Sequence, residues 1–179
     1  MKSLFPHDRI KSAYDVDYKA LKAAGIKAIF FDIDNTLVFH DAPSDENSKA
    51  LIERIHNEGL IVYLISNNKE PRVKSFKEAS MCDGYVFKAG KPLARGFNQA
   101  LKELNIYKEE AVFFGDQIYT DVIGGRNAKL WTILTKPLSA KEPFNIVLKR
   151  IIEFPILLLY VLIRIFIKPS RPMPLIKGE

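Results

Sequence analysis

The chain has 179 residues, of which 47% are hydrophobic and 27% are charged, a composition typical of a folded domain and not of a disordered segment. The formal net charge is +6, but residues 141–179 alone hold seven Lys or Arg residues against three Asp or Glu residues. The rest of the chain is nearly balanced, which argues against a surface that wraps nucleic acid, so we expect no nucleic-acid partner. Cys82 is the only cysteine, which excludes an intrachain disulfide and favours a reducing, cytoplasmic compartment. The N-terminus also lacks the apolar run of a secretory signal.

After an irregular start, apolar runs alternate with amphipathic segments along the chain. Residues 17–24 form a predicted short helix that ends at Gly25, and the apolar run that follows predicts a strand at 27–33, buried on both faces. Ser44 is expected to cap a helix over 44–58, and Pro92 to lie in the first turn of a helix over 91–104. Further helices are expected at 71–79 and 121–128, and further strands at 60–65, 85–87, 111–114 and 130–134. This alternation predicts an α/β fold with a mostly parallel sheet and helices on both faces.

Polar side chains follow the predicted strands. Asp32 and Asp34 come at the end of the first strand, Ser66 directly follows the second, and Asp116 follows the strand at 111–114. Lys91 lies just after the weaker third strand. Because right-handed crossovers bring the carboxyl ends of parallel strands to one edge, we expect these side chains to gather there.

These residue types favour phosphoryl transfer assisted by a divalent cation. Three carboxylates would repel one another without compensation, and Mg²⁺ prefers oxygen ligands. Ser66, Lys91 and strand-end N–H groups would hold a phosphoryl group, which one carboxylate attacks to give an aspartyl-phosphate. A second carboxylate would protonate the leaving oxygen and then activate water.

Each of these motifs has a plainer interpretation when it stands alone. Asp32 and Asp34 could form a turn or a helix cap, and Ser66 could be an N-cap. Lys88 competes with Lys91 as the phosphate ligand, and the Lys-Pro sequence favours Lys91. The three histidines show no metal-ligand spacing and are expected to be ordinary surface or loop residues.

Taken together and in order, four motifs resemble those of the haloacid dehalogenase-like (HAD) phosphatases. They are Phe-Asp-Ile-Asp-Asn-Thr at 31–36, Ser-Asn-Asn at 66–68, Lys-Pro at 91–92 and Gly-Asp at 115–116, with Asp121 beyond them. The resemblance covers roughly residues 15–140 and implies the Rossmann-like HAD fold. It also implies that Asp32 is the nucleophile and a metal ligand, and that Asp34 is the general acid and base.

The resemblance implies roles for the other polar residues as well. Asp34, through its backbone carbonyl, and Asp116 would complete a Mg²⁺ site with Asp32. Ser66, Asn67 and Lys91 would bind the phosphate, and Thr36 would support the first loop. Asp121 would support the metal site indirectly, through water or through one of the metal ligands.

Within the superfamily, the chain is similar to the subclass IIIA proteins of the YqeG family, which are related to mitochondrial phosphatidylglycerophosphate phosphatases. The Phe-Asp-Ile-Asp-Asn-Thr-Leu start, Ser-Asn-Asn and Gly-Asp-Gln-x-x-Thr-Asp-Val-x-Gly-Gly carry this likeness. The chain departs from the family pattern at Lys129, where a glycine is usual, which bears on the turn there and not on the catalytic set.

The segment after the first motif and the segment between the second and third motifs are both too short to hold a cap domain. We therefore expect an open site. An open site suits a substrate that supplies its own cover, such as a lipid headgroup, a protein or a nucleic acid. We expect a HAD phosphatase domain at 1–140 and a basic, apolar tail at 141–179 with a helix over 144–167. The tail's uncharged core has ten residues, against about 20 for a spanning helix, so it is expected to lie in an anionic membrane interface. A core helix or a dimer contact are the alternatives for it.

The sequence therefore favours a Mg²⁺-dependent phosphomonoester phosphatase that is cytoplasmic and peripheral at the membrane. The substrate that the resemblance implies is phosphatidylglycerophosphate, which would yield phosphatidylglycerol. Two alternatives stay open: an open-site phosphatase acting on phosphoproteins or nucleic-acid ends, and a non-catalytic binding protein built on the same fold.

Overall fold

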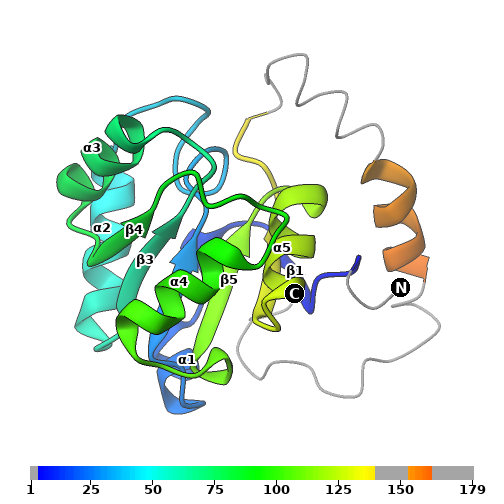
Figure 1. Cartoon of the computed structure of the whole chain (residues 1–179), viewed down its shortest axis with the longest axis horizontal. Coiled ribbons are helices and arrows are strands. Elements are labelled where there is room, and N and C mark those ends of the chain that lie inside the picture. The colour runs from blue at the N-terminus through cyan, green and yellow to red at the C-terminus, as the bar shows by residue number, and fades with distance from the viewer. Residues whose placement is uncertain (1–3, 140–152, 163–179) are drawn as a thin grey trace.

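A computed structural model describes residues 4–139 and 153–162 of the chain, and its centre is a six-stranded sheet (Figure 1). The strand order is β1-β6-β5-β2-β3-β4, and every neighbouring pair is parallel. The strands are β1 (Asp8–Ile10), β2 (Ala28–Phe31), β3 (Ile61–Ile65), β4 (Gly84–Val86), β5 (Ala111–Gly115) and β6 (Trp131–Thr135). The helices are α1 (Tyr18–Ala23), α2 (Glu46–Asn57), α3 (Glu70–Ser80), α4 (Arg95–Leu104) and α5 (Ile123–Asn127). Three short turns of helix join them: η1 (Ala13–Asp15), η2 (Lys108–Glu110) and η3 (Ile118–Val122).

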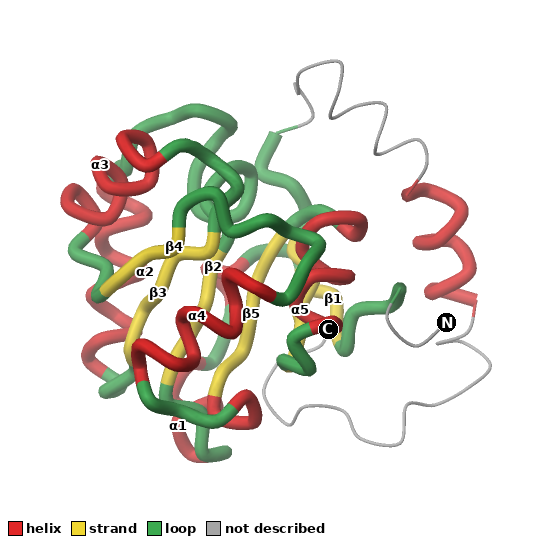
Figure 2. The backbone as a smooth tube through the Cα atoms, viewed as in Figure 1, coloured by secondary structure: helices red, strands yellow, loops and turns green. Residues whose placement is uncertain are grey.

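Helices cover both faces of this sheet, as the sequence predicts (Figure 2). Alternate residues of a strand point to opposite faces, so Phe31 of β2 packs with α1, α2 and α3, and Phe30 packs with α4. The central strands are buried along their whole length, which is why their sequences are continuous apolar runs. The predicted α/β fold class is therefore confirmed.

The structure corrects three local predictions. Residues 8–10, expected to be irregular, form the edge strand β1, which pairs with β6 and begins where the His7 amide donates to the Thr132 carbonyl (2.9 Å). Asp45, and not Ser44, caps α2 by accepting the amide of Ser48 at 2.7 Å. The helix expected from Lys91 begins only at Arg95, and residues 91–94 form a turn in which the Leu93 amide donates to the Gly90 carbonyl at 2.8 Å.

Lys129 replaces the glycine that the family pattern has at the turn before β6. Its φ is +61°, which is the left-handed region that glycine adopts without steric cost. Lys129 therefore stands in a conformation that glycine adopts more readily, in the turn between α5 and β6.

Residues 4–139 hold no inserted domain. The chain between β2 and β3 contains only α2, and the chain between β3 and β5 contains only α3, β4, α4 and η2. Residues 4–139 therefore place no cap domain over the carboxyl ends of β2, β3 and β5, as expected from the motif spacing.

Residues 153–162 are helical and pack beside η3 (Figure 1). Ile156 and Leu157 contact a small cluster formed by Ile118, Val122 and Leu134. The remainder of the helix expected over 144–167 lies outside the described residues. In the part of the chain that the structure describes, none of the helices combines the length and the apolar character that crossing a membrane requires.

Candidate active site

The loop after β2 places two aspartates at the carboxyl edge of the sheet. The amide of Asp32 still belongs to the sheet and donates to the carbonyl of Phe114 at 2.9 Å. The chain then turns sharply: the carbonyl of Ile33 accepts the amide of Leu37 (2.9 Å), and Asn35 has a φ of +60°. Asp34 therefore stands on a tight turn two residues after Asp32, and Thr36 in the same turn is buried.

Lys91 is buried between two of the carboxylates. Its Nζ donates to Asp32 Oδ1 at 2.6 Å and to Asp121 Oδ1 at 2.7 Å, and its side chain is only 3% exposed. Burial opposes the charged form of this lysine, but the negative charges of Asp121 and Asp32 outweigh it and raise the pKa of Lys91 above its ordinary value. Lys91 therefore stays protonated and supplies a fixed positive charge at the base of the site.

Asn67 holds the backbone of Lys91 in place. Its Oδ1 accepts the Lys91 amide at 2.9 Å, and its Nδ2 donates to the Lys91 carbonyl at 3.0 Å. Ser66, at the end of β3, is buried, and its hydroxyl accepts the amide of Asn68 at 3.1 Å. The Ser-Asn-Asn motif thus fixes both its own turn and the loop that carries the lysine.

Asp116 and Asp121 come from the loop after β5. Asp121 Oδ2 accepts the amides of Asp116 (3.1 Å) and Gln117 (3.0 Å), so this side chain closes the loop on itself. A side chain at Gly115 would meet Asp121, since its Cβ would lie 2.6 Å from the Asp121 carboxyl carbon. The glycine of the Gly-Asp motif is therefore required by this close approach.

Asp32, Asp116 and Asp121 form a buried carboxylate cluster, in which one oxygen from each residue lies within 4.8 Å of the other two. Among the described residues, Lys91 forms ion pairs with two members of this cluster, Asp32 and Asp121. Burial raises the pKa of Asp32 to about 7, with Lys91 opposing the rise and Asp121 adding to it. Carboxylate oxygens from three residues in one place are the donor set that a hard divalent cation fits.

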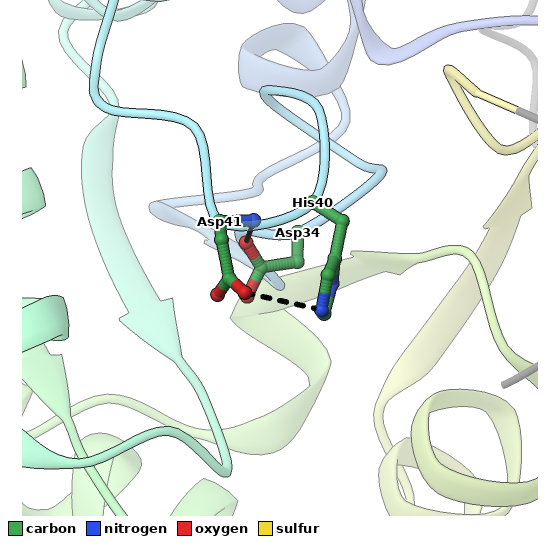
Figure 3. A group of neighbouring side chains, drawn as sticks. All are labelled: Asp34, His40 and Asp41. Carbon is green, nitrogen blue, oxygen red and sulfur yellow. Dashed lines mark hydrogen bonds and ion pairs between the residues drawn. The ribbon is translucent and has the colours of Figure 1, made fainter. Parts of the chain in front are cut away.

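The Asp34 carboxylate lies apart from that cluster, in a second group with His40 and Asp41 (Figure 3). The Asp41 amide donates to Asp34 Oδ1 at 2.9 Å, and His40 Nε2 lies 3.4 Å from Asp41 Oδ2. Asn68 and Arg72 also donate to Asp34, at 2.5 and 3.0 Å. Asp34 is thus held from several sides at the wall of the pocket.

The structure places most of the residues predicted from the sequence at one pocket, whereas Asp116 and Thr36 are buried and do not line it. The pocket at the carboxyl edge is lined by Asp32, Asp34, Asn35, His40, Ser66, Asn67, Asn68, Lys91, Gln117, Thr120 and Asp121. Sequence analysis did not assign roles to His40, Asn68 or Arg72. Asn68 lies inside a motif that it quoted, but nothing in the sequence marks Arg72, because an arginine on an amphipathic helix is ordinarily a solvent-facing residue.

The comparisons with known proteins agree with this geometry. The family model of the haloacid dehalogenase-like hydrolases matches residues 40–129. The Bacillus subtilis "Probable phosphatase YqeG" is 35% identical over 159 residues, which cover 87% of this chain and 91% of that protein. The chain therefore belongs to the haloacid dehalogenase-like hydrolases and, within them, to the YqeG family, and it is a hydrolase of the phosphatase type.

Two further proteins are informative. "Phosphatidylglycerophosphate phosphatase 1, chloroplastic/mitochondrial" of Arabidopsis thaliana is 27% identical over 168 residues, which cover 86% of this chain but only 47% of that protein. The chain thus spans about half the length of this plant relative. Among solved structures, the deoxy-D-mannose-octulosonate 8-phosphate phosphatase YrbI of Haemophilus influenzae superposes with a TM-score of 0.51 at 15% identity, over 65% of this chain and 70% of that one. This likeness shows the shared fold.

Proposed function

We propose that the chain is a Mg²⁺-dependent phosphomonoester phosphatase that acts through an aspartyl-phosphate at Asp32 and hydrolyses phosphatidylglycerophosphate to phosphatidylglycerol. The observation that carries the reaction class is the buried cluster of Asp32, Asp116 and Asp121 around Lys91. Burying three carboxylates close together is costly for folding, because charged groups lose their hydration when they are buried. A reaction that brings a cation and a phosphoryl group to the site would explain why these carboxylates are buried together.

Asp32, Asp116 and the backbone carbonyl of Asp34 would hold the Mg²⁺, and Asp121 would support them through the loop it closes. When bound, the cation supplies positive charge to the oxygens of the transferring phosphoryl group. It also favours the ionised form of Asp32, whose pKa burial otherwise raises to about 7.

In the proposed reaction the Asp32 carboxylate attacks phosphorus, and the bond between phosphorus and the ester oxygen breaks. Asp34 gives its proton to that departing oxygen, so the alcohol leaves neutral. In the second step Asp34 takes a proton from water, whose oxygen attacks the phosphorus of the aspartyl-phosphate. Asp32 is released as a carboxylate and inorganic phosphate leaves.

Lys91, Ser66 and the turn at Asn67 would bind the phosphoryl oxygens. Lys91 already lies against Asp32, so it can contact an oxygen of the group that Asp32 attacks. The side-chain amide of Asn67 is already hydrogen-bonded to the backbone of Lys91. A contact between Asn67 and the phosphate would therefore come from the backbone N–H of Asn67. These donors stabilise the charge that builds up in the transition state.

Two observations favour a lipid substrate. The pocket has no cap over it within residues 4–139, which suits a substrate that is anchored in a larger surface. The plant relative whose name specifies phosphatidylglycerophosphate matches 86% of this chain. A phosphoprotein or a nucleic-acid end would fit an open pocket too, and is the alternative that the substrate test below distinguishes.

The helix over 153–162 supports contact with an anionic membrane surface. One side of it packs on η3 through Ile156 and Leu157, and its Glu153 carboxylate accepts the Tyr119 amide at 2.8 Å. The other side exposes large apolar side chains: Phe154, Leu158, Leu159, Val161 and Leu162. In the sequence, Lys149, Arg150 and Arg164 flank this segment, which is the pattern of a helix at an anionic interface.

We predict that the carboxylate cluster, and not the group around Asp34, binds Mg²⁺. Asp116→Asn should weaken Mg²⁺ binding at least about tenfold, because it removes a charged ligand, whereas the control Asp41→Asn should leave binding unchanged. Titration calorimetry at pH 8 measures both. In the unchanged protein, binding should weaken as the pH falls through about 7, since a proton then competes with the cation for Asp32. Equal effects of the two substitutions would contradict this assignment.

For the substrate, we predict that the protein releases phosphate from phosphatidylglycerophosphate in mixed vesicles when Mg²⁺ is present. Asp32→Asn should reduce the rate to background, because an amide cannot attack phosphorus. The measurement compares kcat/KM on this lipid with that on glycerol phosphate, on a phosphopeptide and on a 5′-phosphorylated oligonucleotide. A clear preference for any of these three soluble substrates would rule out the lipid assignment.

For the membrane surface, we predict that Leu158→Ser combined with Leu162→Ser lowers binding to anionic vesicles about tenfold, because two apolar side chains no longer enter the interface. Vesicle flotation measures the bound fraction. The matched control is Met81→Ser with Tyr107→Ser, which removes apolar side chains of equal or greater exposure on other elements. Equal loss in the two double variants would show that the helix has no special role.

A further inference from the structure

Three donors from three different segments hold the Asp34 carboxylate. Oδ1 accepts the backbone amide of Asp41 at 2.9 Å and Nη2 of Arg72 at 3.0 Å, and Oδ2 accepts Nδ2 of Asn68 at 2.5 Å. The Asp34 side chain is 13% exposed, so these contacts are shielded from bulk water. The carboxyl group is therefore fixed in rotation as well as in position.

Arg72 is itself immobilised before it reaches Asp34. It lies in the first turn of α3, and its Nη2 also donates to the Ala42 carbonyl at 2.6 Å. Its guanidinium stands over the ring of Phe76, 5.6 Å from the centroid. An arginine held by a carbonyl and an aromatic ring presents its donor at one fixed point. Arg72 thus connects α3, the loop at 39–44 and the Asp34 carboxylate.

The two oxygens of Asp34 differ in how many donors they accept. Oδ1 accepts two N–H groups, which occupy both of its lone pairs, whereas Oδ2 accepts only the Asn68 amide among the described residues. A proton on Oδ1 would face the N–H groups of Asp41 and Arg72. Oδ2 is consequently the oxygen with room for a transferable proton.

We propose that Arg72 is a positioning residue, which locks the Asp34 carboxylate so that Oδ2 carries the proton to and from the reacting oxygen. This inference rests on the proposed function, in which Asp34 is the general acid and base. As the ester bond breaks, the proton passes from Oδ2 to the departing oxygen; Arg72 keeps all of its protons and contacts neither phosphorus nor the alcohol. Proton transfer is sensitive to the orientation of donor and acceptor, so loss of the lock slows this step first.

The test compares two phosphate esters that differ in their need for a proton. An alkyl ester such as glycerol phosphate releases a poor leaving group that must be protonated, whereas p-nitrophenyl phosphate releases a stable phenolate without one. Arg72→Met keeps an apolar stem over Phe76 and removes the donor. It should lower kcat on the alkyl ester about 10- to 100-fold and change kcat on the nitrophenyl ester by no more than about threefold.

Arg54 provides a matched control. Its Nη2 also donates to a backbone carbonyl, that of Tyr14, at 2.7 Å, and its guanidinium also stands over an aromatic ring, that of Tyr18, at 5.4 Å. It contacts no carboxylate of the site among the described residues. Arg54→Met should therefore leave the ratio of the two kcat values unchanged, even if it lowers the melting temperature.

Three outcomes decide the inference. The inference is supported if Arg72→Met lowers kcat selectively on the alkyl ester and has no further effect in an Asp34→Asn background. The two residues would then act on the same step. An equal loss on both esters, or a full loss in the Asp34→Asn background, overturns it and leaves Arg72 a structural residue. If Arg72→Met does not fold, Arg72→Lys carries the same comparison, with a smaller but still selective loss expected. If the unchanged protein hydrolyses neither ester and also releases no phosphate from phosphatidylglycerophosphate, the proposed function itself fails; if it hydrolyses only the lipid, that lipid serves as the alkyl ester, and an equal loss of lipid hydrolysis in Arg72→Met and Arg54→Met overturns the inference.

Discussion

The charge balance at the carboxyl edge of the sheet is the constraint on which the rest of the structure depends. Asp32, Asp116 and Asp121 are buried together, and Asp32 and Asp121 share one ion-pair partner, Lys91. Most of the surrounding contacts keep this unfavourable group in place: Asn67 clamps the Lys91 backbone, and Asp121 accepts two amides of its own loop. Carboxylate oxygens gathered in this way are ligands for a divalent cation, through which an anionic phosphoryl group can approach.

The loop after β5 serves two surfaces at once. On one side it supplies Asp116 and Asp121 to the carboxylate cluster, and on the other Ile118 and Val122 of η3 receive the helix over 153–162. The Tyr119 amide, between these two sides, is bonded to Glu153. Gln117 and Thr120 line the pocket in this same segment, so the helix over 153–162 packs against the segment that forms one wall of the pocket.

Much of this fold follows directly from the sequence, and the exceptions have physical reasons. The apolar runs at 28–31 and 111–114 predict buried strands, and the aspartates that follow them predict the site. Asp8-Arg9-Ile10 has no apolar run, and it becomes a strand only because β6 offers a free edge. Ser44 and Asp45 are both good caps, so sequence alone does not choose between them. Arg72 acquires its contact with Asp34 only when α3 folds against the loop at 39–44.

The central claim is that Asp32 forms an aspartyl-phosphate, and trapping that species tests it most directly. Acid quenching during turnover of a radiolabelled phosphomonoester should leave label on the protein, and hydroxylamine should release it, as expected of an acyl phosphate. Borohydride reduction should convert the modified aspartate to homoserine, which peptide mass spectrometry should locate at position 32. Turnover without any trapped phosphate, or label at another residue, would contradict the account.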